Sequence, residues 1–155
     1  FSMFLAKRLD GLVGWGFNMS DGQNIQFIVD YDTTNLRVKS NTGAFSTGAW
    51  THIGVSWNGS SAASSILLYS SGVQISSTVS TDGVGSRVSD SSSPLFIICR
   101  NATTGCVSGY ITEVGLFNRV LSSSEFGDIY TNGLTQTAGG VALGGMTPRG
   151  YWGDI

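Results

Sequence analysis

Short runs of alternating apolar and polar residues divide this chain, and glycine, serine, asparagine and aspartate separate them. A period of two places alternate side chains on opposite faces of an extended strand. Runs of this length and spacing are typical of an antiparallel β-sandwich rather than of alternating strands and helices. We expect strands at 1–7, 14–19, 24–30, 35–40, 50–57, 65–70, 73–79, 94–100 and 109–117.

The composition agrees with an all-β fold and excludes two classes of partner. Of the 155 residues, 22 are glycine and only 12% are charged, so helix-favouring lysine and glutamate are scarce. The net charge of −2, without a cluster of basic residues, predicts no nucleic-acid partner. No apolar run approaches the roughly 20 residues that cross a bilayer, so we expect no membrane insertion. The length suits one domain.

The run at 50–57 shows the clearest alternation, and we expect it to be a central strand. Its two faces carry Ile53, Val55 and Trp57 on one side and His52, Gly54 and Ser56 on the other. The aromatic residues that fall within predicted strands are expected to lie mostly in the core. They are Trp15, Phe17, Trp50, Trp57 and Tyr69.

One short helix is predicted near the C-terminal end of the last run. Ser122 can cap its first turn, and Glu125, three residues later, can reach back to the cap. Gly133 is placed to end the helix. An apolar side formed by Phe126, Ile129 and Tyr130 would lie on the sandwich.

The two cysteines, Cys99 and Cys106, enclose a segment with the composition of a hairpin tip. They can therefore face each other across neighbouring strands and form a disulfide, and two separate buried thiols are the alternative. A disulfide would indicate an oxidising compartment. We accordingly expect an extracellular protein, secreted or at the cell surface.

Three segments resemble the laminin-G-like jelly-roll domains of the concanavalin A-like lectin/glucanase superfamily. They are FSMFLAK at 1–7, GAWTHIGVSWNGS at 48–60 and GYITEVGLFNRVLSSSEFGDIY at 109–130. The resemblance covers about 1–134, in the order that the family shows. It implies an all-β, two-sheet antiparallel jelly-roll sandwich with one short helix near the C-terminal end.

The resemblance also implies one or more strands before the counterpart of 1–7, and this sequence has none ahead of Phe1. We therefore divide the chain into a laminin-G-like domain at 1–134 and a Gly-rich tail at 135–155. The tail could fill the position beside the first strand in its own subunit or in a neighbouring copy. Its apolar assembly residues are Val141, Leu143, Met146, Tyr151 and Trp152.

The inventory of titratable residues argues against an enzyme. Relatives that cleave glycans present closely spaced acids on one strand, whereas Glu113 has no acidic partner two or four residues away and Glu125 is explained by the helix cap. His52 is the only histidine, and we expect it to be structural. We predict no catalytic residues.

Two kinds of accessory site are compatible with the sequence. Asp30, Asp32, Asp82 and Asp90 could offer oxygen ligands to Ca²⁺, which some family members bind, although aspartate in turns is the simpler interpretation. No other cofactor is predicted. Asn-x-Ser/Thr sequons at Asn18, Asn58 and Asn101 could carry covalent N-glycans. Asn58 lies at a predicted hairpin tip and Asn101 inside the cysteine loop, whereas Asn18 lies near a strand end.

Two functions follow from this set of features. The first is a structural or adhesive subunit that assembles with other copies of itself, as a filament or surface coat, through β-strand addition by the tail. The second is a carbohydrate-binding module of a larger secreted protein, in which the tail is a linker and glycans are the partners.

Overall fold

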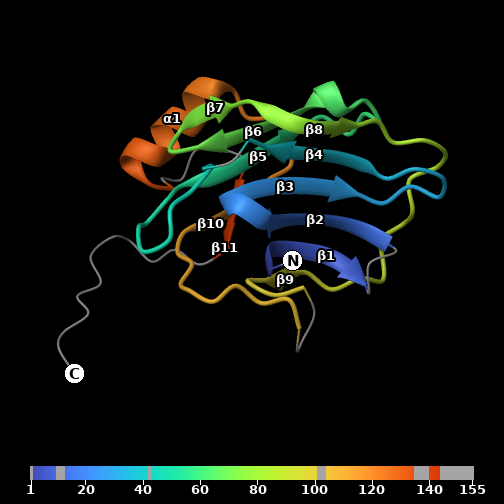
Figure 1. The fold of residues 1–155 in the computed structure, drawn as a ribbon, viewed down its shortest axis with the longest axis horizontal. Coiled ribbons are helices and arrows are strands. Elements are labelled where there is room, and N and C mark those ends of the chain that lie inside the picture. The colour runs from blue at the N-terminus through green and yellow to red at the C-terminus, as the bar shows by residue number, and fades with distance from the viewer. Residues whose placement is uncertain (1, 10–12, 42, 101–103, 135–139, 144–155) are drawn as a thin grey trace.

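A computed structural model describes residues 2–9, 13–41, 43–100, 104–134 and 140–143 of the chain. Within them, a six-stranded antiparallel sheet has the order β8-β4-β3-β2-β1-β9, and a three-stranded sheet has the order β5-β6-β7 (Figure 1). The first sheet contains β1 (Ser2–Leu9), β2 (Val13–Ser20), β3 (Asn24–Val29), β4 (Leu36–Ser40), β8 (Ser77–Thr81) and β9 (Phe96–Ile97). The all-β, two-sheet sandwich expected from the sequence is confirmed.

The remaining elements in the described part of the chain include the second layer, a two-stranded pair, one helix and two 3₁₀ turns, of which η1 (Asp21–Gln23) joins β2 to β3 of the first sheet. They are β5 (Ile53–Trp57), β6 (Ile66–Ser70), β7 (Val73–Ile75), the β10 (Val114–Phe117) and β11 (Gly140–Leu143) pair, the helix α1 (Ser123–Asn132), and the 3₁₀ turns η1 and η2 (Ala63–Ser65). In Figure 1, α1 lies beside β7 at the upper left, and β8 and β9 are at opposite edges of the large sheet.

Apolar rows that run across the strands of the large sheet form the main core. Phe17 of β2 is paired with Phe27 of β3, which is paired with Val38 of β4, so the three side chains share one face. This face packs against Ile66 and Leu68 of β6. Full burial of each large apolar side chain contributes about 1.5–3 kcal/mol, so these rows hold the two sheets together.

The opposite face of the small sheet is covered by α1. Because side chains alternate, Tyr69 points away from the main core and stacks on Phe126 of the helix, with ring centroids 3.8 Å apart. Gly54 lies opposite Tyr69 on β5, and its missing side chain leaves room for the Phe126 ring. The alternation predicted at 50–57 is therefore real, and both of its faces are covered.

The helix begins and ends where the sequence predicts. The Ser122 hydroxyl accepts a hydrogen bond from the Glu125 N–H at 3.3 Å, and the Glu125 carboxylate accepts one from the Ser122 N–H at 2.8 Å. This reciprocal capping box satisfies two donors that the first turn leaves free. Gly133, at φ 76°, ends the helix, as a residue without a side chain can.

Several strand predictions were wrong in extent. The run at 73–79 forms two strands in different sheets, because the chain leaves β6 at β7 and joins β4 as β8 two residues later. The run at 94–100 forms only the two-residue β9, which ends where Ile98 has φ 63°. β5 lies at the edge of its sheet, not at the centre. Trp50 lies outside β5 and is 73% exposed.

We predict that Gly54→Ala destabilises the protein by about 1–3 kcal/mol, because the added methyl group overlaps the buried Phe126 ring. Gly127→Ala is the matched control, since a methyl group at this helical position meets no atom within 4 Å and alanine favours a helix. The free energy of unfolding from urea titrations measures both. Equal stability of the two variants would contradict the packing described for α1.

Candidate functional site

The strand β11 comes from the Gly-rich tail and pairs with β10. The pairing is antiparallel, and Val141 and Leu143 are the Cα partners of Leu116 and Val114. The tail therefore completes a two-stranded sheet in its own subunit, at a place that the sequence analysis did not indicate. The other predicted tail residues, Met146, Tyr151 and Trp152, lie outside the described residues.

The position beside β1, where we expected the tail, is occupied by residues 96–100 and 104–107. β9 pairs with Leu5 and Ala6, the Ile98 N–H donates to the Phe4 carbonyl at 2.7 Å, and the Met3 N–H donates to the Gly105 carbonyl at 2.9 Å. The expectation that the tail fills this edge is thus corrected. The segment that does so follows β8 in the chain and contains both cysteines.

A disulfide between Cys99 and Cys106 closes the segment that covers β1. The predicted bond is present, and the Val107 N–H donates to the Ile98 carbonyl at 2.8 Å beside it. A loop this short restricts the unfolded chain enough to contribute ~2.5 kcal/mol on the chain-entropy model. The disulfide therefore helps to hold this segment beside β1.

A buried ion pair holds the end of β1 to the end of β3. The Arg8 guanidinium donates to both carboxylate oxygens of Asp30, at 2.7 and 2.6 Å, and the Asp30 side chain is 1% exposed. A second cluster lies nearby, where Asp90 contacts Lys7 at 3.6 Å and Arg87 at 3.3 Å. Breaking a buried pair such as Arg8–Asp30 costs about 3–5 kcal/mol, so Asp30 has a clear structural role. The pairs of Asp90 involve partly exposed cations and contribute less.

Each of the four aspartates considered as calcium ligands has its own structural partner. Asp30 binds Arg8, Asp90 binds two cations, Asp82 accepts the Ala63 N–H at 2.7 Å, and Asp32 accepts the Ser86 N–H at 3.0 Å. Among the residues with described positions, no three histidine, cysteine, aspartate or glutamate side chains are grouped as metal ligands. The structure does not bring the four together, and calcium binding stays a prediction.

The residues weighed for catalysis all contact neighbouring structural groups. The Glu113 carboxylate accepts the Leu134 N–H at 3.3 Å, just beyond the end of α1. Hydrogen bonds from Arg119, first, and from Ser122 lower the pKa of Glu125 to about 2. His52 lies between Phe126 and Tyr130, with ring centroids 6.4 and 6.0 Å away, and burial lowers its pKa while Glu113 opposes the shift. These contacts assign Glu125 to the helix cap and His52 to packing, and the buried Nδ1 of His52 has no hydrogen-bond partner among the described residues.

The asparagines of the three sequons differ in how exposed their side chains are to solvent. Asn18 is 1% exposed, its amide donates to the Met19 carbonyl at 3.1 Å, and its oxygen accepts from Gln26 at 3.4 Å. A glycan on that nitrogen does not fit this buried position, so the candidate at Asn18 is corrected. Asn58 is exposed, and its side-chain oxygen accepts the Ser60 N–H at 2.9 Å in the turn after β5. Asn101 lies outside the described residues.

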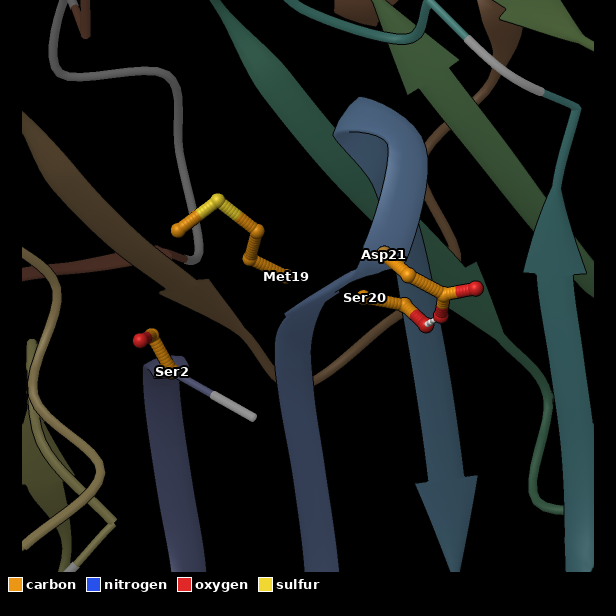
Figure 2. Close-up of a pocket in the computed structure, with 4 residues that line it drawn as sticks. All are labelled: Ser2, Met19, Ser20 and Asp21. Atoms are coloured by element: carbon orange, nitrogen blue, oxygen red, sulfur yellow. Dashed lines mark hydrogen bonds between the residues drawn. The ribbon is translucent and has the colours of Figure 1, made fainter.

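An open depression lies beside the start of β1 and the end of β2, with a volume of ≈ 380 Å³ (Figure 2). Ser2, Met19, Ser20 and Asp21 line it. Hydrogen bonds from the Ser20 hydroxyl, first, and from the Lys39 ammonium lower the pKa of Asp21 to about 2. The depression thus carries a carboxylate that stays ionised, but its only large apolar surface is Met19.

Exposed aromatic side chains lie elsewhere on the surface. Trp50 precedes β5 and is 73% exposed, Tyr110 precedes β10 and is 90% exposed, and Tyr130 on α1 is 54% exposed. The prediction that Trp50 lies in the core is therefore wrong, and the exposure of Tyr110 was not predicted. The residues before each aromatic side chain could have indicated an exposed loop. Threonine and glycine lie shortly before Trp50, and serine and glycine directly precede Tyr110.

The comparisons with known proteins agree with this architecture. The family model described as the concanavalin A-like lectin/glucanases superfamily matches residues 2–126. Curated proteins and solved structures gave no match. In the described part of the chain, neither α1 nor any other helix has the length and apolar character of a membrane span.

Proposed function

We propose that this chain, which belongs to the concanavalin A-like lectin/glucanases superfamily, is a non-enzymatic, extracellular structural or adhesive module that assembles with other copies of itself. The Cys99–Cys106 disulfide supports an oxidising compartment. The engagement of Glu113 and Glu125 in hydrogen bonds at opposite ends of α1 supports a non-enzymatic role, since a glycosidase needs two carboxylates that face one substrate.

The pairing of β11 with β10 carries the proposal of assembly. β11 follows α1 in the chain and touches the body of the domain through β10, by four Cα pairs. The same four pairs form if β11 of one copy occupies β10 of the next, so exchange between copies conserves these backbone contacts. A neighbour then completes each subunit, and copies joined in this direction can extend into a filament.

The full chain should form oligomers, and we expect a chain that lacks 138–155 to form none. The deletion removes β11, so no copy has a strand to place beside β10 of another copy. Light scattering after size exclusion and electron microscopy compare the two chains. A synthetic peptide of 138–155 should bind the truncated chain, and the same peptide with Val141→Pro should bind less, since proline lacks the N–H of a ladder donor. Monomers with and without the tail, or unchanged filaments after the deletion, would contradict exchange.

Asn58 is the sequon whose described surroundings leave space for a glycan. In eukaryotic secretory expression we expect Asn58→Gln to lower the intact mass by one glycan, while Ser60→Thr retains it because the sequon is preserved. Mass spectrometry before and after glycosidase treatment measures the change. If the masses of Asn58→Gln and the parent chain differ only by the one methylene group that the substitution adds, the site is empty.

Carbohydrate binding is the second candidate, and the exposed indole of Trp50 favours it. Exposed aromatic faces stack on sugar rings, and this side chain has no core to join. A glycan array with and without calcium should then show binding by the monomer that Trp50→Ala removes. Val84→Ala, at a 50% exposed aliphatic residue, is the control. Binding that survives Trp50→Ala, or no binding on any glycan, would exclude this platform.

A further inference from the structure

The sequence contains two Asn-Gly pairs, at Asn58–Gly59 and at Asn132–Gly133. At such a pair the backbone nitrogen of the glycine can attack the side-chain amide carbon of the asparagine, because glycine has no side chain to block the approach. The first pair lies in the turn that follows β5, and Asn58 and Gly59 are both exposed. The second pair lies at the C-terminal end of α1. The same reacting groups are therefore held in two different surroundings.

The side-chain oxygen of Asn58 already accepts a hydrogen bond in the folded chain. The Ser60 N–H donates to this Oδ1 at 2.9 Å. Attack on the amide carbon moves negative charge onto the same oxygen. A donor that is in place before the attack stabilises this charge without any rearrangement of the turn. The Ser60 N–H is therefore positioned to favour attack at Asn58.

Ser60 is itself held by its neighbours. The Trp57 indole N–H donates to the Ser60 carbonyl at 2.8 Å, and the Ser60 hydroxyl accepts the Ala62 N–H at 3.1 Å. Trp57 packs on Phe27 of the core, with ring centroids 5.8 Å apart. The donor to the Asn58 oxygen is thus fixed through the core as well as by the turn.

The two glycine nitrogens differ in their hydrogen bonds. Among the described residues, the Gly59 N–H has no hydrogen-bond acceptor, and a Cβ atom built on Gly59 would meet nothing within 4 Å. The Gly133 N–H donates to the Ile129 carbonyl at 2.9 Å and closes the last turn of α1. Attack by the Gly133 nitrogen has to break this bond first. The folded chain therefore favours reaction at Asn58 over Asn132.

We propose that Asn58 is a site of spontaneous modification, at which the chain cyclises and the side-chain amide becomes a carboxylate. The Gly59 nitrogen bonds to Cγ of Asn58, its proton passes through solvent to Nδ2, and the Cγ–Nδ2 bond breaks to release ammonia. Water then opens the cyclic imide at either carbonyl carbon, which gains the hydroxyl group while the ring nitrogen regains a proton. The products are aspartate and isoaspartate at position 58, and no oxidant or reductant takes part.

The modification removes the sequon and adds a negative charge to the turn. N-glycosylation uses the same amide nitrogen, so a given chain carries either the glycan or the new carboxylate at position 58. This competition rests on the glycan proposed above, whereas the cyclisation needs only the turn. Chains made in a host without N-glycosylation therefore test the cyclisation alone.

The two Asn-Gly pairs serve as internal controls for each other. The folded chain and the chain in urea are incubated in mildly alkaline buffer made with heavy-oxygen water, and mass spectrometry of peptides follows both sites. In the folded chain we expect Asn58 to be converted at least about tenfold faster than Asn132, to aspartate and isoaspartate that both carry heavy oxygen. In urea the rates should be similar. Equal rates in the folded chain, or slower conversion of Asn58 there than in urea, overturns the proposal.

Trp57→Phe tests the positioning of the Ser60 N–H. The substitution keeps an aromatic ring beside Phe27 and removes the indole N–H that holds the Ser60 carbonyl. We expect conversion of Asn58 to slow several-fold in the folded chain and to be unchanged in urea, where this bond is absent. An unchanged rate at Asn132 shows that the fold is intact. Conversion of Asn58 at the parent rate in folded Trp57→Phe overturns the role proposed for Ser60.

Discussion

The contact between the apolar face of β2, β3 and β4 and the facing side of β6 determines where every other element lies. Once Leu68 is buried against the Phe17, Phe27 and Val38 row, alternation forces Tyr69 to the opposite face, and Tyr69 then stacks on α1. Gly54 on the neighbouring strand makes this third layer sterically possible. The position of the capped helix therefore depends on the sandwich core, through the contact of Phe126 with Tyr69.

The large sheet is covered differently at its two edges. The described residues 96–100 and 104–107 cover β1 by backbone hydrogen bonds, and the Cys99–Cys106 disulfide closes this cover. At the other edge, β8 pairs with β4 and has a register shift, and a bulge of this kind makes an edge less suited to pair with another chain. Exchange of β11 uses neither edge, so the assembly that we propose leaves the large sheet unchanged.

Local signals predicted the parts of the fold that depend on local chemistry. The capping box, Gly133 and the hairpin composition between the cysteines act within a few residues, so α1 and the disulfide were predicted correctly. The division of 73–79 into β7 and β8 was not predictable, because it depends on which sheet each half joins. The missed exposure of Trp50 has the same cause: a tryptophan beside a strand is usually buried, and only the course of the loop shows otherwise.

The accessory sites show why residue type alone overestimates function. Asn18 carries a glycosylation signature, and Asp30 is of the type that binds calcium, yet both are 1% exposed on the polar face of the sheet. Period-two alternation assigns them to a solvent-facing side, whereas burial there requires each polar group to find a partner, as Gln26 and Arg8 provide. The residues free to meet a partner are those whose side chains have few contacts within the subunit, and on this reasoning the exposed Trp50 is a stronger functional candidate than Asn18 or Asp30.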